Sequence, residues 1–437
     1  MKKLLLTTTA LITLVAAVAD AAPKKAKKAA KAEMATMEHE EMHKHHAHFK
    51  VDLHGRQEFN LAARSVKKEY MYGDDVVRNK NGYLTSNQKN FAFDSNTKVN
   101  LEVSAHSNNG LKYGANVALK PAGNAKNRNF SSMDNTFLFL EGGFGRVEAG
   151  SNFSAVTMME LGAHSVATAT GGVSGYWGDY ANVVTPGTGA DKSENYILTG
   201  RNTVYRSALA NDTGMKSTLV GTESARKVTY MSPKYSGVQL GFSYTPDQAN
   251  NGAFNAGAPV TGLTSINEGR LKNVFGVVLG YDHKLSGVDF AGEAHYQGGK
   301  NTSVVAANNL SEWGVGAKVA KGPMSLAASY DNANKSNTLK TDVGQKNYYW
   351  TVGVGYEMDK LAASVTYLNG NQGDKTDPAA HNMSKTSAWS VGLDYMLASG
   401  LKTYAEFTAY NLKNAKIQGA NPANKGNVFL VGGVVKF

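Results

Sequence analysis

The stretch Gly426-Asn-Val-Phe-Leu-Val-Gly-Gly-Val-Val-Lys-Phe437 predicts a strand that ends on an aromatic residue. Side chains alternate between the two faces of an extended strand. One face of this strand therefore holds Phe429, Val431, Val435 and Phe437. A soluble domain rarely exposes an aromatic side chain at the last position of a strand, whereas barrels in lipid carry an outward apolar band with aromatic residues at both interfaces. The stretch therefore favours the closing strand of a transmembrane β-barrel.

The same alternation recurs through the chain from Phe49 onward. The clearest cases are Trp313, Val315, Ala317 and Val319 against Glu312, Gly314, Gly316 and Lys318, then Val288, Phe290, Ala294 and Tyr296 against Asp289, Glu293, His295 and Gln297. Segments 347–357 and 389–395 repeat this order. One apolar and one polar face per strand is typical of lipid outside and water inside a barrel.

Turn spacing predicts the number of strands. Short connections rich in Gly and Ser, as tight hairpins require, occur near 107–109, 142–145, 234–237, 284–287, 321–323, 358–360 and 398–400. Longer polar stretches separate them. We therefore expect an all-β fold, a 16-stranded antiparallel transmembrane β-barrel over residues 49–437. An even count predicts that both termini are periplasmic. Tyr281, Tyr356 and Tyr395 precede short turns, where they predict an aromatic belt.

The N-terminal segment is typical of exported proteins. Lysines at positions 2 and 3 precede an apolar run and small residues, which predicts a signal peptide over residues 1–21. A membrane anchor is the alternative, although the run is short for a bilayer of about 30 Å. Cysteine is absent, so disulfide and thiol chemistry are excluded. The mean hydropathy of −0.35 suits a barrel with a polar interior, because only alternate strand residues face lipid.

Residues 22–48 form a segment of different composition. Its first half is rich in Lys and Ala, and its second half holds five of the eleven histidines between His39 and His48. We interpret it as a periplasmic extension, disordered or helical, and most simply as a solvated linker. Weak metal-ligand candidates are His39, His43 and His46. The lysines could instead contact peptidoglycan by charge.

Several motifs together resemble the general trimeric porins of Gram-negative outer membranes. Residues 51–56 (Val-Asp-Leu-His-Gly-Arg) resemble the first strand of that family. Gly142-Gly-Phe-Gly145 resembles its hairpin between the fourth and fifth strands, and residues 228–237 resemble the hairpin that follows the constriction loop. Phe437 completes the set. The resemblance covers about residues 49–437 and implies a homotrimeric barrel in outer-membrane lipid that passes small hydrophilic solutes and ions.

The resemblance also implies how the pore is narrowed. In that family the third loop folds inward, and here the stretch 151–225 is the longest connection. The loop acids that it places at the constriction are Glu160, Asp179 and Asp191. A surface lid is the alternative role for this loop.

Basic residues on the wall are expected to oppose the loop acids. Carried over by position, they are Arg56, Lys98 and Arg226, with Lys227 as the less favoured alternative to Arg226. Arg56 and Lys98 also fall on the polar face of their predicted strands. Opposed acids and bases would set up an electric field across the pore. Ser151 stands where the family often has a further basic residue, so this chain has one basic residue fewer to contribute to that field.

The sequence therefore predicts an outer-membrane diffusion channel. Alternatives are a structural or adhesive barrel anchored to the cell wall by the extension, and a substrate-specific porin. No spacing indicates a catalytic site, so we expect no enzyme, no cofactor and no nucleic-acid partner. Residues 49–437 carry eight of the eleven net positive charges, which predicts mild anion preference.

Overall fold

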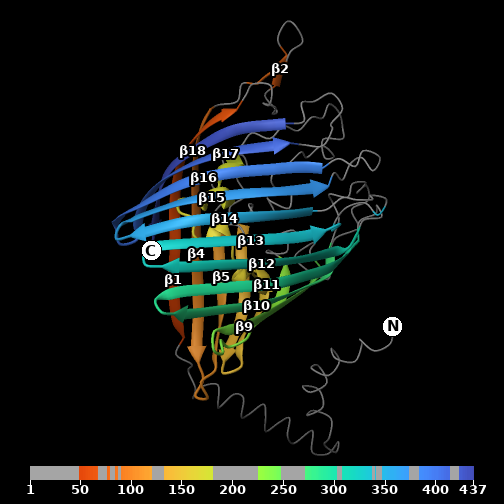
Figure 1. The fold of residues 1–437 in the computed structure, drawn as a ribbon. Coiled ribbons are helices and arrows are strands. Elements are labelled where there is room, and N and C mark those ends of the chain that lie inside the picture. The colour runs from red at the N-terminus through yellow and green to blue at the C-terminus, as the bar shows by residue number, and fades with distance from the viewer. Residues whose placement is uncertain are drawn as a thin grey trace, which may run out of the picture.

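The structure is a computed structural model that describes residues 49–66, 76–78, 84–86, 90–120, 132–180, 225–247, 271–302, 308–336, 340, 347–373, 383–413 and 423–437. These residues form a closed antiparallel barrel of sixteen strands, which confirms the predicted fold class (Figure 1). The predicted signal peptide, 1–21, and the extension, 22–48, lie outside the described residues.

The barrel strands follow one another around the wall in chain order, and the last pairs with the first. They are β1 (Lys50–Val66), β4 (Phe91–His106), β5 (Lys112–Lys120), β6 (Ser132–Gly142), β7 (Gly145–Ser151), β8 (Arg226–Met231), β9 (Val238–Asp247), β10 (Leu271–Leu285), β11 (Val288–Asn301), β12 (Leu310–Lys321), β13 (Met324–Asn334), β14 (Asn347–Met358), β15 (Leu361–Gly373), β16 (Met383–Ala398), β17 (Leu401–Lys413) and β18 (Ala423–Lys436). A separate small sheet pairs β2 (Val76–Arg78) with β3 (Leu84–Ser86).

The alternation predicted from the sequence is present in the strands. On β12, the side chains of Trp313 and Val315 are 41% and 45% exposed, whereas Glu312, the residue before Trp313, is completely buried. The apolar side chains point outward, where lipid would cover them, and the polar ones point inward. Outward aromatic side chains stack between neighbouring strands, as Trp350 does with Tyr367 at a centroid distance of 5.2 Å. Such pairs stabilise neighbouring strands beyond the area that they bury.

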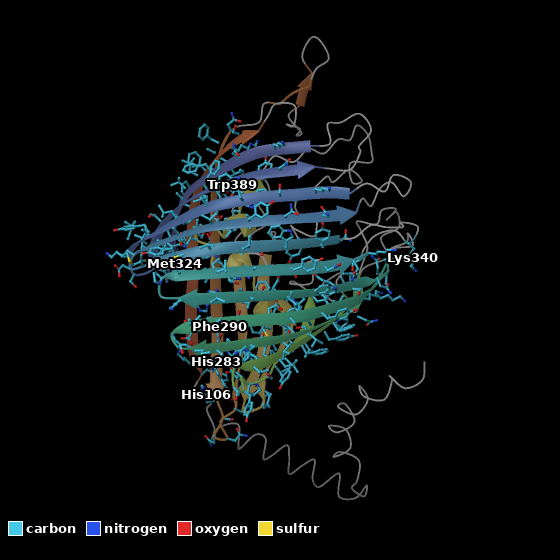
Figure 2. The ribbon with its side chains drawn as sticks, in the orientation of Figure 1. His106, His283, Phe290, Met324, Lys340 and Trp389 are labelled. Carbon is cyan, nitrogen blue, oxygen red and sulfur yellow. The ribbon has the colours of Figure 1, made fainter. Side chains whose placement is uncertain are left out.

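The barrel closes between β1 and β18. Gly55 N donates to Phe437 O at 2.8 Å, and Phe437 N donates back to Gly55 O at 3.1 Å. The short turns of β10 to β15 lie at the end of the barrel where the C-terminus lies (Figure 1). Met324 marks that end and Lys340 the opposite one (Figure 2). Tyr281 and Tyr395 are exposed beside the short turns, as the predicted aromatic belt requires.

A chain segment with little regular structure follows β7. Its short helical turns are α3 (Ala155–Met159), η2 (Ala163–Ser165), η3 (Gly172–Ser174) and α4 (Trp177–Tyr180). We call residues 152–180 the inner segment, because its contacts lie on inward-facing side chains of the barrel. Within the described part of the chain, no helix has the length and apolar character needed to cross a bilayer.

Candidate functional site

Backbone amides of the inner segment donate hydrogen bonds to hydroxyl groups on the inner wall of the barrel. A chain inside a barrel needs partners for its own N–H groups, since an unpaired buried amide is costly. The pairs are Ala155 with Ser243, Ala163 with Thr351, Thr168 with Ser364 and Val173 with Thr366, at 2.6 to 2.9 Å. The acceptors belong to β9, β14 and β15. The inner segment therefore follows the wall around the barrel.

Two wall carboxylates hold the middle of the inner segment. Glu406 on β17 is buried and accepts from Thr170 N at 3.1 Å, Thr170 Oγ1 at 2.8 Å and Gly172 N at 3.0 Å. Asp394 on β16 accepts from Ala169 N at 2.8 Å and pairs with Lys402 at 2.7 Å. A hydrogen bond to a charged group stabilises by about 1.5–3 kcal/mol. These carboxylates therefore act as anchors for the segment.

Glycines on the inner face of the barrel allow the inner segment to lie close to the wall. Glycines on the inner faces of β9, β10, β12, β14 and β16 lie beneath it, namely Gly241, Gly276, Gly316, Gly353 and Gly392. A Cβ atom on Gly353 would stand 2.9 Å from Cγ2 of Val166 and 3.2 Å from Cα of Ala163. A larger side chain there would push the segment away from the wall.

The far end of the inner segment crosses to β1 and β4. The Tyr176 hydroxyl accepts from Arg56 Nη2 and from Asn96 Nδ2, each at 3.2 Å. Arg64 Nη1 donates to the carbonyl oxygen of Tyr180 at 3.1 Å. The inner segment thus contacts β9 to β17 along its length and β1 and β4 at its end.

The structure brings two of the predicted wall bases together. Arg56 and Lys98 are direct partners in the β1–β4 register, and both lie on the inner side. Arg226 is different, because it is exposed on the same side of β8 as the outward-facing Val228. The choice of Arg226 as a wall base is wrong. Lys227 points inward instead and donates to the carbonyl oxygens of Ala225, at 2.8 Å, and Asn152.

The predicted loop acids have separate outcomes. Glu160 is buried against the wall rather than exposed to water, and Tyr349 donates to its Oε1 at 3.2 Å. Burial raises the pKa of the Glu160 carboxyl well above its ordinary value, and the neighbouring Asp331 carboxylate adds to the rise. The predicted constriction acid Glu160 therefore packs against the barrel wall beside Tyr349, and its role at the constriction stays a prediction. Asp179 belongs to α4, but its side chain is outside what the structure describes, as is all of Asp191.

The inner faces of β4 to β7 have a different character. Lys112 pairs with Glu102 at 3.5 Å, and Arg146 pairs with Glu141 at 2.8 Å and with Glu148 at 2.7 Å. The side chains of Lys112, Glu102 and Arg146 are 31%, 24% and 27% exposed. They are inward-facing charges that water reaches.

Comparison with known proteins settles the family. A sequence model described as Gram-negative porin matches residues 7–415. The chain belongs to this family. An uncharacterized protein of Rickettsia typhi is 25% identical to this porin over 404 residues, covering 81% of the chain and 87% of the relative. An uncharacterized protein of Rickettsia prowazekii is equally similar over 407 residues.

Among solved structures, the porin shares its fold with an anion-selective porin from Comamonas acidovorans. The TM-score is 0.55 at 14% identity, and the match covers 89% of this chain and all of the other. At this identity the likeness supports the barrel fold alone. Family and fold together indicate a channel protein of the outer membrane.

Sequence reasoning missed several residues of the porin interior. Glu406 and Tyr349 lie on inward-facing positions, so alternation could have placed them inside, but nothing local links them to residues 160–172. Lys227 was named only as the less favoured alternative to Arg226, although it is the inward-facing residue of the two. The histidines His39, His43 and His46 lie outside the described residues, and their metal binding stays a prediction.

Proposed function

We propose that this porin is a diffusion channel for small hydrophilic solutes and ions, narrowed by the inner segment. The observation that carries the proposal is the contrast between two parts of the wall. We call the inner faces of β9 to β17 the covered wall and those of β4 to β7 the open wall. Inward side chains of the covered wall, such as Ser364 and Thr366, are almost completely buried beneath the segment. The open wall instead presents partly exposed charges, including Lys112 and Arg146.

The water-filled passage in this proposal runs between the inner segment and the open wall. Ions cross a barrel where charged and polar side chains keep water in place, and the charges set which ions are preferred. Arg56 and Lys98 are paired on β1 and β4, where β1 meets the open wall; Arg56 is partly exposed and Lys98 is buried next to it. With the net positive charge of residues 49–437, they support a mild preference for anions.

We also propose the assembly and orientation that the family resemblance suggests. The porin forms a homotrimer, and its even number of strands supports placing both termini in the periplasm. An extension on that side would then be able to contact peptidoglycan through its lysines. These are proposals about the full-length protein in its membrane.

The test is conductance of the full-length protein, refolded and inserted in a planar lipid bilayer. Stepwise openings in groups of three support a trimeric channel, and a reversal potential measured across a salt gradient gives the ion preference. A potential of the sign expected for anion flow supports the assignment of Arg56 and Lys98. A folded barrel that carries no current would overturn the proposal and favour a structural barrel.

A further inference from the structure

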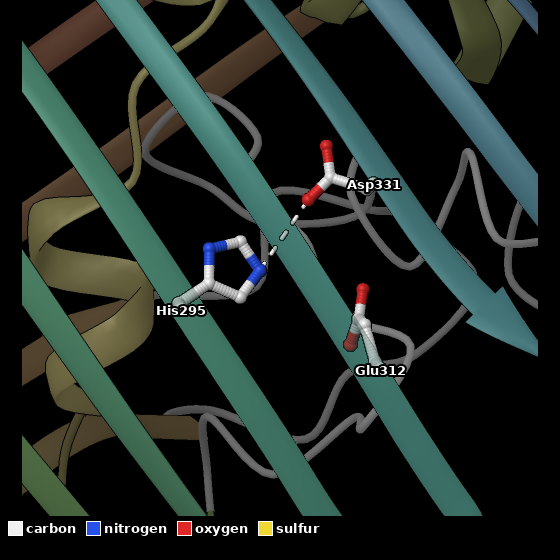
Figure 3. A group of neighbouring side chains, drawn as sticks. All are labelled: His295, Glu312 and Asp331. Atoms are coloured by element: carbon white, nitrogen blue, oxygen red, sulfur yellow. Dashed lines mark ion pairs between the residues drawn. The ribbon is translucent and has the colours of Figure 1, made fainter.

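A cluster of buried ionisable side chains lies on the covered wall at β11, β12 and β13. His295, Glu312 and Asp331 come from these three neighbouring strands and point toward one another (Figure 3). One ligand atom from each lies within 4.8 Å of the others. The other charged residues of the covered wall that contact the inner segment, Lys318, Asp394 and Glu406, each hydrogen-bond to it directly, so this separate group of charges needs an explanation.

The register of the three strands creates the cluster. His295 pairs with Gly314, and Gly314 pairs with Asp331, so the three residues form a row across the sheet. A Cβ atom on Gly314 would stand 2.3 Å from Asp331 Oδ1 and 2.6 Å from His295 Nε2. The missing side chain at the centre of the row therefore leaves space between the two flanking residues.

The centre of the cluster is acidic and dry. Glu293 and Asp331 lie on either side of His295, at 3.0 and 3.4 Å from its two ring nitrogens, and the side chains of all three are at most 1% exposed. Buried carboxylates are strongly unfavourable unless positive charge or bound protons compensate them.

Three polar groups in the cluster lack hydrogen bonds among the described residues, namely the Asp331 carboxylate, Oε1 of Glu293 and Nε2 of His295. Nε2 and Oδ1 of Asp331 form an ion pair at 3.4 Å, which is longer than a normal hydrogen bond (Figure 3). The buried Glu406 on the same covered wall differs, because it accepts three hydrogen bonds from the inner segment. A cation between Nε2 and the Asp331 carboxylate would give both groups the close partner that this long contact does not supply.

Glu293 orients the imidazole as a metal site requires. Its Oε2 lies 3.0 Å from His295 Nδ1, where it can accept the Nδ1 proton. That tautomer leaves the lone pair of Nε2 directed toward Asp331. Histidines that bind metals commonly donate their other ring N–H to a carboxylate in this way.

We propose that His295, Glu312 and Asp331 bind one divalent transition-metal ion, with Zn²⁺ as the best fit. One imidazole nitrogen and carboxylate oxygens suit Zn²⁺ better than Ca²⁺ or Mg²⁺, which prefer oxygen ligands alone. Tetrahedral bonds of about 2.0–2.2 Å place ligand atoms about 3.3–3.6 Å apart. The three atoms lie within 4.8 Å of one another, so side-chain movements of up to about 1.5 Å would be needed to reach that geometry.

An ion bound at this site would lie next to the beginning of the inner segment, which suggests a structural role. Glu160 ends α3 in the inner segment, and Tyr349 links its carboxylate to β14 beside the cluster. A cation held by the three strands would attract this fourth carboxylate. Metal binding would thus fasten the beginning of the inner segment to the covered wall, as Glu406 fastens its middle.

The test measures zinc in the full-length porin, refolded with Zn²⁺ and freed of excess metal. The histidines of the extension could bind zinc themselves, so all five between His39 and His48 are first replaced by Gln. Mass spectrometry of the metal content should find one zinc per chain in this background. His295→Gln and Asp331→Asn should each remove it, whereas Glu406→Gln, a matched buried carboxylate, should retain it. Glu293→Gln should weaken binding by about 10- to 100-fold, as loss of an orienting partner does.

A second measurement needs no variant at the site. Co²⁺ added in place of Zn²⁺ during refolding of the same background should give the visible absorption of a site with nitrogen and oxygen ligands. Heat-modifiable electrophoretic mobility verifies that each protein has folded. The proposal is overturned if the folded background binds no zinc and gives no cobalt spectrum, since protons would then neutralise the cluster. Zinc retained in folded His295→Gln and Asp331→Asn would overturn it as well.

Discussion

The covered wall and the open wall belong to the same barrel but carry different chemistry. Inward positions of the covered wall, such as Thr351 and Thr366, are small hydroxyl residues that accept hydrogen bonds from backbone amides. The open wall carries long charged side chains, such as Arg146, that pair with each other and contact water. A hydroxyl can enter a dry interface at small cost, whereas a charge requires water or a partner. The type of inward side chain therefore separates the part of the interior that packs against the inner segment from the part where we propose that solutes pass.

The largest expected effect comes from adding bulk beneath the inner segment. Gly353→Leu would place side-chain atoms where Val166 and Ala163 now lie. Overpacking of this kind destabilises by about 1–3 kcal/mol. We expect a lower free energy of unfolding and a lower single-channel conductance, because the segment is pushed toward the passage.

Gly292→Leu is the matched control for this prediction. Gly292 lies on the outward side of β11, and a Cβ atom there would have its nearest neighbour at 3.8 Å. Conductance should stay at the wild-type value in this variant. Unchanged conductance in a folded Gly353→Leu variant would show that the covered wall does not border the passage.

A smaller effect is expected from the bases at the edge of the passage. Removing one unit charge about 7 Å from a permeating ion in water changes its energy by about 0.6 kcal/mol, close to a threefold change in preference. Lys98→Gln and Arg56→Gln should each move the reversal potential toward cations by that amount. The control is Lys284→Gln, which removes one charge at the exposed turn before β11. Equal shifts in all three variants would contradict a passage beside Arg56 and Lys98.

The smallest effect on permeation should follow Tyr176→Phe, which removes the hydroxyl that joins the inner segment to β1 and β4. Loss of these hydrogen bonds is expected to cost about 0.5–1.5 kcal/mol. The end of the segment should move more, and open-channel current noise should rise. Tyr230→Phe removes a hydroxyl that donates to Phe144 O at 2.8 Å outside the lumen, and it should leave the noise unchanged. Unchanged current noise in Tyr176→Phe would show that contacts other than the Tyr176 hydroxyl hold this end of the inner segment in place.

The success of the sequence analysis follows from the local nature of its signal. Alternation on β12 and the hairpin glycines depend only on residues close in the chain, and both predicted the structure correctly. The Arg226 assignment was wrong because a shift of one residue reverses the face of a strand. The burial of Glu160 could not be predicted for another reason. The resemblance assigned it to the constriction loop, but its packing depends on Tyr349, which is 189 residues away.

The proposed metal site could not be predicted for the same reason, because its residues come from strands that only the barrel brings together. His295, Glu293 and Glu312 were each placed on polar faces by alternation, yet alternation does not say which strands of the barrel the inner segment covers. Gly314 is important only because of its neighbours in the register, His295 and Asp331. No spacing along the chain reveals a ligand set drawn from three strands.

The class of fold, the number of strands and the side of the wall on which most residues lie could all be predicted from the sequence. These features follow from a period of two and from turn chemistry, which any short window of the chain contains. The packing of the inner segment, the charges that it buries and those that it leaves beside water became known only from the folded barrel. Those outcomes depend on barrel closure, because closure brings residues 152–180 against strands that are far away in the chain.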